Sequence, residues 1–433
     1  MKAAFFTLGC KVNQYETQEM TEALRRYGFL IVDEKEEADV YIINSCSVTA
    51  ESDRKTRQAV RHFRKQNRDA VVVLTGCMPQ ANKEVPRLLP EADIIMGNRN
   101  NSSLIQNIHT FLERRERIVD LLDHKKGEVF SGTRISAFDG HTRAFVKIQD
   151  GCDRFCSYCI IPYARGRSRS KPLCEIKQEV AALAQNGYAE VVFVGINLSA
   201  YGRDIGLGIC DAVAAAAEVK GIQRVRLGSL EPDHITDGVL QALRSIEKFC
   251  PHFHLSLQSG SNAVLGRMNR HYTAEEYQAL AQKIRAVFAD ASVTTDIIAG
   301  FPGETEEEFA QTLAFAKALR FDKAHIFPFS VRPGTRAAQM GGQLGKAAKA
   351  ERCARLSAVC EEIRAEIFSA QIGKTLSVLV ESAKENNTTG YTKNYTPVTL
   401  RNTVLPAGQT AFVRVTGADA EGCYGETEAA GQE

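Results

Sequence analysis

Three cysteines stand close together near the middle of the chain at C-x3-C-x2-C spacing: Cys152, Cys156 and Cys159. A structural zinc site normally takes four protein ligands, and the next cysteine, Cys174, lies well downstream. Three thiolates can instead hold three irons of a 4Fe-4S cluster and leave the fourth iron open. An open iron can chelate a small molecule through an amine and a carboxylate. The spacing therefore favours an iron–sulfur cluster with an open site over a zinc loop or a set of buried thiols.

Three other cysteines, Cys10, Cys46 and Cys77, each follow a short apolar run that is predicted as a β-strand. The carboxyl ends of parallel strands meet at one edge of a sheet, so we expect these cysteines to lie together there. Three unrelated core cysteines would not all fall just after strand ends, although buried thiols remain the alternative. The sequence predicts a second cluster with three protein ligands, whose open iron could bind an exogenous sulfur species.

Residues 1–112 supply the strands that carry this second set. Apolar runs alternate there with helical patterns; the runs are at residues 3–8, 40–44, 71–74 and 94–96, and the helices at residues 14–27, 51–64, 85–89 and 104–112. This alternation with Val/Ile-rich strands predicts an α/β domain with a parallel sheet covered on both faces. Residues 113–143 are charged and poor in periodicity, and we expect a linker with one short strand.

Residues 144–370 repeat a strand–helix unit six times and end in one long helix over residues 346–370. Right-handed repeats of this kind curl a sheet toward a barrel, which eight units would close. Six units predict a partial, open barrel with its active site at the carboxyl ends of the strands. Residues 371–433 change to short strands between turn residues, which predicts a small all-β barrel with a tail that frays from Gly417 onward.

Polar residues and glycines follow several of the barrel strands, where ligands of such barrels bind. Gly195 and Asn197 come after the second strand, Gln258 ends the fourth and Asp296 ends the fifth. Together with Tyr158, which precedes the last cysteine of the motif, they are expected to contact the small molecule at the open iron. The glycine also suits an ordinary strand-to-loop turn, whereas Gln258 and Asp296 are not turn requirements.

Two groups of basic residues indicate a polyanionic partner. The first is a stripe of five arginines at alternating spacings of three and four, which places them on one helical face: Arg54, Arg57, Arg61, Arg64 and Arg68. The second directly follows the cysteine motif: Arg165, Arg167, Arg169 and Lys171. A solvated face usually mixes charges of both signs, so these one-sign groups favour contact with RNA over a solvated surface.

Composition narrows the class of protein further. The chain has 433 residues, 44% of them hydrophobic, and a net charge of only +2, so nucleic-acid contact must rest on local groups. No apolar run approaches the ~20 residues of a membrane span, and the N-terminus lacks the basic flank and cleavage site of a signal peptide. We expect a cytoplasmic protein without membrane contact, whose twelve cysteines do not form disulfides.

The motifs together resemble the radical S-adenosylmethionine (radical SAM) methylthiotransferases, and the likeness spans nearly the whole chain. It is carried by TLGCKVNQYE at residues 7–16, NSC at 44–46, TGC at 75–77, GC at 151–152, IIPYARGRSR at 160–169, LSLQSG at 255–260 and the stretch at 296–305. The resemblance implies an N-terminal methylthiotransferase domain at residues 1–112, a radical SAM partial (βα)6 barrel at 144–370 and a TRAM-like barrel at 371–433.

The resemblance also implies two 4Fe-4S clusters. Cys10, Cys46 and Cys77 would hold an auxiliary cluster, and the C-x3-C-x2-C cysteines would hold the cluster that cleaves SAM. One SAM would methylate a sulfur at the auxiliary cluster, and a second would yield a 5′-deoxyadenosyl radical that removes hydrogen from carbon 2 of an adenine. This chemistry belongs to the cofactors, so no catalytic side chain is assigned. An external electron donor and a sulfur donor are implied.

Within this family, the opening LGCKVNQY most resembles the group that acts on N6-threonylcarbamoyladenosine beside the tRNA anticodon. Relatives that modify isopentenyladenosine or a ribosomal protein differ after this cysteine and remain alternatives, as does a non-catalytic RNA-binding iron–sulfur protein. The TRAM-like region departs from a basic RNA clamp, because residues 371–433 hold five Lys/Arg against seven Asp/Glu. RNA contacts there would use stacking or shape.

Overall fold

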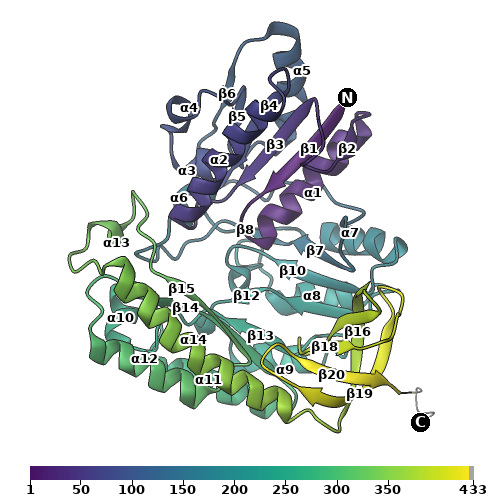
Figure 1. Ribbon diagram of the computed structural model, residues 1–433, viewed down its shortest axis with the longest axis vertical. Coiled ribbons are helices and arrows are strands. Elements are labelled where there is room, and N and C mark those ends of the chain that lie inside the picture. The colour runs from purple at the N-terminus through teal and green to yellow at the C-terminus, as the bar shows by residue number, and fades with distance from the viewer. Residues whose placement is uncertain (429–433) are drawn as a thin grey trace.

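The computed structural model describes residues 1–428. It has three regions, an N-terminal sheet domain, a central barrel and a small C-terminal barrel (Figure 1). In Figure 1 the N-terminal domain lies above the central barrel, and the C-terminal barrel lies against its lower right side. Within these residues, no helix is both long enough and apolar enough to cross a membrane.

The N-terminal domain is a six-stranded parallel sheet with the strand order β2-β1-β3-β4-β5-β6. Its strands are β1 (Lys2–Thr7), β2 (Leu30–Val32), β3 (Val40–Ser45), β4 (Val71–Gly76), β5 (Ile94–Met96) and β6 (Ile118–Asp120). Its helices are α1 (Lys11–Arg26), α2 (Ala50–Gln66), α3 (Cys77–Ala81), α4 (Val85–Leu88) and α5 (Leu104–Arg114), with a 3-10 turn at Asn101–Ser103. One apolar core lies on each face of the sheet, and the two central strands are wholly buried. The predicted parallel sheet covered on both faces is thus confirmed.

The short strand expected between residues 113 and 143 is β6, and it pairs with β5 at the edge of the N-terminal sheet. The sheet therefore extends beyond residue 112, where the linker was expected to begin. The other edge strand, β2, was not predicted from the sequence. Both edge strands have only three residues, which is too short for an alternating pattern to stand out.

The central region is a partial barrel of six parallel strands. These are β7 (Arg143–Lys147), β10 (Glu190–Val194), β11 (Arg224–Leu227) with β12 (Ser229–Leu230), β13 (His252–Leu255), β14 (Ser292–Ala299) and β15 (Lys323–Pro328). The third strand is interrupted at Gly228, so that β11 pairs with β10 and β12 pairs with β13. Between the strands lie α7 (Leu173–Gln185), α8 (Ile209–Ala217), α9 (Asp237–Arg244), α10 (Asn262–Arg267), α11 (Ala274–Val287) and α12 (Glu306–Leu319). The predicted six-unit open barrel is confirmed.

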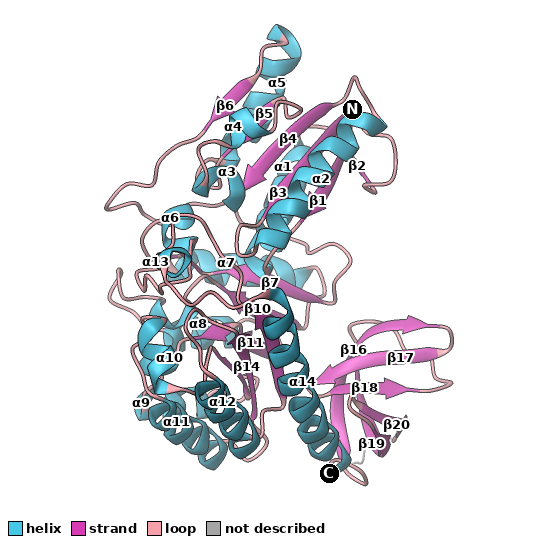
Figure 2. Cartoon of the chain, turned by 60° about the vertical axis from the view of Figure 1, so that its left-hand side comes forward, coloured by secondary structure: helices cyan, strands magenta, loops and turns pink. Residues whose placement is uncertain are grey.

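Short elements border the barrel. Three short elements follow the first strand in sequence: β8 (Gln149–Asp150), α6 (Ile161–Arg165) and β9 (Arg169–Ser170). A 3-10 turn at Leu198–Ala200 follows β10, another at Pro232–His234 follows β12, and α13 (Arg336–Gln339) follows β15. The long helix α14 (Lys346–Ser369) then runs past β15 and leads to the C-terminal barrel (Figure 2).

The C-terminal region is a closed five-stranded barrel with the order β16-β17-β18-β20-β19. Its strands are β16 (Thr375–Lys384), β17 (Asn387–Thr392), β18 (Pro397–Leu400), β19 (Thr410–Ala418) and β20 (Cys423–Thr427). The prediction of a small all-β barrel is confirmed, but the prediction of a tail that frays from Gly417 is wrong. β20 closes the barrel by pairing with β18 and β19, and it buries Cys423 in the core. Residues 429–433 of the expected tail lie outside the described residues.

Charged side chains join the three regions. Arg332, which follows β15, donates to Asp53 Oδ2 of the N-terminal domain at 2.7 Å. Arg224 and Arg226 in β11 donate to carbonyl oxygens of the C-terminal barrel, at 2.9 Å for Tyr391 and 2.8 Å for Lys393. The C-terminal barrel therefore covers the amino ends of the barrel strands, and the N-terminal domain lies at their carboxyl ends.

Candidate active site

The structure brings Cys10, Cys46 and Cys77 to one edge of the N-terminal sheet, and we refer to them as the N-terminal triplet. Cys10 precedes α1 after β1, Cys46 follows β3, and Cys77 begins α3 after β4. The loops approach closely, because a Cβ added to Gly9, which has a φ of +116°, would lie 2.8 Å from Cys46 Cβ. Only glycine combines this backbone angle with this approach. The carboxyl edge of the sheet thus gathers three thiols from distant parts of the chain.

Asparagine side chains support the N-terminal triplet. Cys10 Sγ lies 3.2 Å from Asn13 Oδ1, and Asn13 Nδ2 donates to Asn44 Oδ1 at 3.1 Å. Asn98 Nδ2 lies 3.8 Å from Cys77 Sγ. Burial raises the pKa of Cys77 to about 12. A thiolate at this position therefore needs a nearby cation to offset its desolvation, as a bound metal does.

The second set of cysteines, Cys152, Cys156 and Cys159, lies in the loop behind the first barrel strand, and we refer to it as the barrel triplet. The backbone N–H of Arg154 donates to Cys152 Sγ at 3.5 Å, and Arg270 Nη1 donates to Cys156 Sγ at 3.3 Å. Burial raises the pKa of Cys152 to about 11 and the pKa of Cys159 to about 12. Donors aimed at sulfur stabilise the thiolate form that a metal requires.

Among the described residues, neither triplet has the closely spaced ligand atoms of a single-ion site. Among residues 1–428, the one group of three His, Cys, Asp or Glu side chains with ligand atoms all within 4.8 Å of one another is His254, Asp296 and His325. The sulfurs of each triplet are therefore spread more widely than the ligands of one ion would be. All six cysteines are free thiols. Three thiolates are the donor set that holds three irons of a 4Fe-4S cluster and leaves the fourth iron open, and each triplet offers this set.

A network of buried charges ties the loop of the barrel triplet to α1, the helix that follows Cys10. Arg165 donates to both carboxylate oxygens of Glu16, at 2.7 and 2.9 Å. Lys147 Nζ lies 3.1 Å from Glu16 Oε1 and 3.4 Å from Asp150 Oδ2. Every one of these side chains is at least nine-tenths buried, so the network couples the positions of the two triplets.

This network corrects the prediction that Arg165 and Arg169 contact RNA. Both side chains are buried, and Arg169 Nη2 lies 3.3 Å from Asp150. Lys171 of the same basic run is also fully buried. The run looked unpaired in the sequence because its carboxylate partners lie outside it. Arg167 is its exposed member, with a side chain that is 65% exposed.

The arginine stripe of α2 also differs from its prediction. Arg64 turns toward the domain, where it pairs with Asp93 and donates to three backbone carbonyls. Arg68 lies beyond the end of the helix at Gln66, so it does not belong to the helical face. The prediction that all five share one helical face is therefore wrong for these two residues, although Arg68 is exposed. Arg54 and Arg61 are exposed on α2, and Arg57 is half-buried there.

A cavity of about 450 Å³ lies inside the partial barrel, and we refer to it as the lumen cavity. It is lined by the loop that carries Cys10, by Gly195 and Gly228 in the barrel, and by Tyr395 of the C-terminal barrel. Its charged and titratable side chains, apart from Cys10 and Tyr395, are Lys11, His252, His254, Asp296, Lys323 and His325. All three regions of the chain thus contribute to one cavity, and Cys10 stands at its edge.

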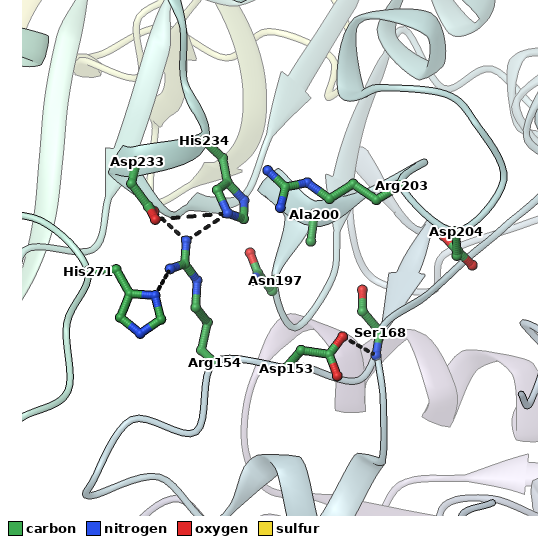
Figure 3. A pocket seen from close by; sticks show the side chains of 10 residues that line it. All are labelled: Asp153, Arg154, Ser168, Asn197, Ala200, Arg203, Asp204, Asp233, His234 and His271. Atoms are coloured by element: carbon green, nitrogen blue, oxygen red, sulfur yellow. Dashed lines mark hydrogen bonds and ion pairs between the residues drawn. The ribbon is translucent and has the colours of Figure 1, made fainter. Parts of the chain in front are cut away.

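A second pocket, of about 540 Å³, lies beside the loop of the barrel triplet (Figure 3). Arg154 donates to His234 Nε2 and to His271 Nδ1, each at 2.8 Å, and pairs with Asp233. Asn197 lines the same pocket, and its Oδ1 has no hydrogen-bond partner among the described residues. This polar pocket adjoins the barrel triplet directly, because Arg154 belongs to the cysteine motif itself.

The other residues predicted to bind a small molecule fall into two places. Tyr158, which precedes Cys159 in the motif, packs edge to face on Phe301. Gln258 has a φ of +72° and its N–H donates to the Asp296 carbonyl at 2.8 Å, which joins the ends of the fourth and fifth strands. Gly195 and Asp296 line the lumen cavity, where Asp296 Oδ2 lies 3.2 Å from His254 Nε2.

Sequence reasoning did not single out Arg270 or Lys11. Arg270 reaches Cys156 across a sequence separation of 114 residues and also binds the Glu231 carboxylate at 2.5 Å. Nothing in the sequence around Arg270 signals this contact. Lys11 directly follows Cys10, so the sequence does place it beside a predicted cluster ligand. The sequence does not show that its side chain faces a cavity, because that depends on how the domains pack.

Comparison with known proteins agrees with this arrangement. Residues 2–97 match the model described as Uncharacterized protein family UPF0004, and residues 146–316 match the Radical SAM superfamily. A similar fold occurs in the radical S-adenosylmethionine methyltransferase TsrM from Kitasatospora setae, with a TM-score of 0.57 and 14% identity over 78% of this chain and 73% of that chain. An open barrel with three cysteines behind its first strand defines a radical SAM protein.

Relatives that match most of the chain narrow this class. Threonylcarbamoyladenosine tRNA methylthiotransferase MtaB of Bacillus subtilis (strain 168) is 38% identical over 95% of this chain and 93% of its own length. The same-named protein of Aquifex aeolicus (strain VF5) is 40% identical over 88% of this chain and 93% of its own. The tRNA-2-methylthio-N(6)-dimethylallyladenosine synthase of Alkaliphilus oremlandii (strain OhILAs) is 34% identical over 88% and 82%. The chain belongs to the radical SAM methylthiotransferase family, whose members use two 4Fe-4S clusters and SAM.

Proposed function

We propose that this enzyme adds a methylthio group to carbon 2 of N6-threonylcarbamoyladenosine beside the anticodon of tRNA. The observation that carries the proposal is the lumen cavity, in which Cys10 of the N-terminal triplet lines the same space as Gly195 and Gly228 of the barrel. A base in this cavity would lie beside Cys10 of the N-terminal triplet and against the carboxyl ends of the second and third barrel strands. Relatives named for threonylcarbamoyladenosine, at 37–40% identity, support this choice of base.

In this proposal the N-terminal triplet holds an auxiliary 4Fe-4S cluster and the barrel triplet holds the cluster that binds SAM. When bound, the clusters supply the open irons for sulfur transfer and for one-electron cleavage of SAM. Arg270 stabilises the Cys156 thiolate from 3.3 Å, and Asn98 approaches Cys77 on the other side of the site. The side chains position the cofactors and exclude water, and none acts as a general acid or base.

We assign the SAM contacts to residues around the barrel triplet. Tyr158 lies within the motif, Asn197 lines the pocket next to Arg154, and Gln258 ends a barrel strand. Gly195 and Asp296 line the lumen cavity and would face both SAM and the base.

The tRNA would approach across the N-terminal domain. Phosphate contacts fall to the arginines that reach the surface, because exposed guanidiniums can pair with phosphates whereas the buried ones cannot. These are the exposed Arg54, Arg61, Arg68 and Arg167 and the half-buried Arg57. The anticodon loop would splay the target base into the lumen cavity. An external electron donor and a sulfur donor complete the reaction, and the C-terminal barrel covers the far end of the cavity.

The proposal is tested with enzyme reconstituted with iron, sulfide, SAM and a chemical reductant. Three substrates are compared: an anticodon stem-loop RNA with N6-threonylcarbamoyladenosine, the same RNA with N6-dimethylallyladenosine, and a small-subunit ribosomal protein. Mass spectrometry should find the methylthio product on the first RNA. Product only on the second would favour the function named for the relatives that are 34% identical. Failure to form any 5′-deoxyadenosine from SAM would indicate a non-catalytic RNA-binding protein.

A further inference from the structure

The charge of the lumen cavity goes beyond what the methylthio chemistry requires. Two lysines, Lys11 and Lys323, line it, and within the described residues neither ammonium group forms an ion pair with the carboxylate of the lining. Asp296 is the one carboxylate in the lining, and it is already engaged by His254 at 3.2 Å. Two lysines against one carboxylate leave the cavity with an excess of positive charge.

A buried polar group in the same cavity also lacks a partner. The His252 side chain is 6% exposed, and its Nε2 lies 3.0 Å from Thr294 Oγ1. Its Nδ1 has no hydrogen-bond partner among residues 1–428. The ring packs at a tilt against Tyr395, with centroids 4.8 Å apart. Buried polar atoms without partners are rare in folded proteins, and one at a cavity wall points to a polar ligand.

The start of α1 adds to this positive field. The helix begins at Lys11, has no side-chain cap and has no acidic residue in its first turn. The free N–H groups of a helix N-terminus favour anions. Gly9, Cys10 and Val12 line the cavity together with Lys11, so this end of the helix faces the cavity.

We propose that the lumen cavity binds the threonylcarbamoyl substituent of the base, with Lys11 as the specificity-determining residue that pairs with its carboxylate. This inference rests on the proposed function. The threonylcarbamoyl group carries one carboxylate, one hydroxyl and several amide-like polar atoms, whereas a dimethylallyl group is a hydrocarbon. An unpaired ammonium group desolvated against a hydrocarbon is unfavourable, so the same lysine that binds the acid disfavours the apolar base.

The position of Lys11 also links recognition to chemistry. Lys11 is the next residue after Cys10, so a carboxylate held by its ammonium group fixes the base relative to the N-terminal triplet. Lys323 stands on β15, at the opposite edge of the open barrel from β7, and would contribute less directly. The apolar part of the lining, Val194, Leu227 and Phe327, offers a surface for the purine ring.

The test measures binding of two synthetic anticodon stem-loop RNAs to the full-length reconstituted enzyme by fluorescence anisotropy. One RNA carries N6-threonylcarbamoyladenosine, and the other carries the same group with its carboxylate converted to a neutral carboxamide. A charge-assisted pair predicts that the unsubstituted chain prefers the acid by on the order of tenfold. Equal affinity for the two RNAs in the unsubstituted chain overturns the inference by itself.

Substitutions then assign the preference to a residue. Lys11→Gln should bring the ratio of the two affinities close to one without weakening binding of the carboxamide RNA, and Lys11→Arg should restore most of the preference. The matched control is Lys220→Gln, an exposed lysine outside the cavity, which should leave the ratio unchanged. Iron content is measured for each variant, because Lys11 adjoins Cys10. If Lys11→Gln loses iron, Lys323→Gln serves in its place and should lower the ratio about threefold.

Different results would contradict the proposed function and the role of Lys11. If the enzyme methylthiolates the dimethylallyl RNA and not the threonylcarbamoyl RNA, the proposed function is wrong. If it methylthiolates the threonylcarbamoyl RNA while the lysine variants keep the full preference for the acid, the proposed function stands and this inference is wrong.

Discussion

The two cysteine triplets reach the same kind of geometry by different routes. The barrel triplet lies within eight residues of one loop, so the local chain holds it together. The N-terminal triplet gathers residues 10, 46 and 77 from the ends of three strands, and it exists only when β1, β3 and β4 are paired in register. Chain connectivity alone keeps the first set close together, whereas the second set depends on the pairing of the sheet.

The surroundings of the two triplets differ as well. Arg270 and the backbone N–H of Arg154 aim positive charge or dipole at the sulfurs of the barrel triplet. Within the described residues, the side-chain hydrogen-bond partners of Cys10 and Cys77 are neutral asparagines, at 3.2 Å for Asn13 and 3.8 Å for Asn98. The positive charge near the N-terminal triplet comes from the buried Arg165, which makes no hydrogen bond to a sulfur but partly offsets the rise that burial causes in the pKa of Cys77. Donors that stabilise negative sulfur raise the potential of a cluster and ease its reduction. This contrast is consistent with electron uptake at the barrel triplet and sulfur transfer at the N-terminal triplet.

The largest expected effect comes from removing one triplet at a time. Cys152→Ala, Cys156→Ala and Cys159→Ala together should halve the iron content and abolish 5′-deoxyadenosine production. Cys10→Ala, Cys46→Ala and Cys77→Ala together should also halve the iron, spare SAM cleavage and abolish methylthiolation. Iron analysis and chromatography of the SAM products measure both. The division of labour would be refuted if the N-terminal variant, still folded, lost all 5′-deoxyadenosine production.

The same contrast explains which parts of the site could be predicted from the sequence. The barrel triplet and the strands around it were predictable, because spacing and alternation are local signals. The N-terminal triplet was predictable only through the rule that parallel strands share a carboxyl edge. The contacts of Arg165, Arg64 and Arg270 were not, because their partners lie far away in sequence. The basic run at residues 165–171 has the pattern of a surface patch in the sequence. In the folded protein Glu16 and Asp150 pair with its buried arginines.

The second largest effect is expected for Arg165→Met, which should lower the stability of the protein because it removes the buried ion pair that links the two triplets. Although burial alone would raise the pKa of Glu16, the charges of Arg165 and Lys147 lower it. The stabilisation is therefore present at neutral pH and is lost only as the pH falls through this depressed pKa. Leaving Glu16 buried without its main partner should lower the free energy of unfolding by about 3–5 kcal/mol. Thermal unfolding at neutral pH measures the loss.

Arg167→Met is the matched control, since Arg167 pairs with Asp153 on the surface at 2.9 Å. Its effect should stay below about 1 kcal/mol. If the two variants unfold at the same temperature, the buried network does not couple the domains as inferred.

An effect of intermediate size is expected for Arg270→Gln, which removes the guanidinium from Cys156 and Glu231. The barrel cluster should become harder to reduce, and SAM cleavage should slow by on the order of tenfold, the size of one charge-assisted hydrogen bond. Arg270→Lys should recover part of the rate. Potentiometric titration followed by electron paramagnetic resonance reports the potential independently of activity. Arg267→Gln, which affects a pair with Glu308 instead, serves as the control. An unchanged potential in Arg270→Gln would remove the proposed electronic difference between the triplets.

The smallest expected effect concerns the outer face of α2, close to the N-terminal triplet. Within the described residues Arg57 forms no ion pair and Arg61 has only a partly exposed partner, Glu91, at 3.1 Å, so both guanidiniums can turn to phosphate. Arg57→Gln with Arg61→Gln should weaken tRNA binding a few-fold and flatten the slope of log affinity against log salt by about one to two, because each lost phosphate contact removes roughly one released counterion. Arg64→Gln should instead lower stability and leave this slope unchanged, because Arg64 is held by Asp93 and by backbone carbonyls. Affinities measured at several salt concentrations separate the two outcomes. If the double variant keeps the original slope, the face of α2 is a solvated surface, and the phosphate contacts near the two triplets must come from other exposed side chains such as Arg167.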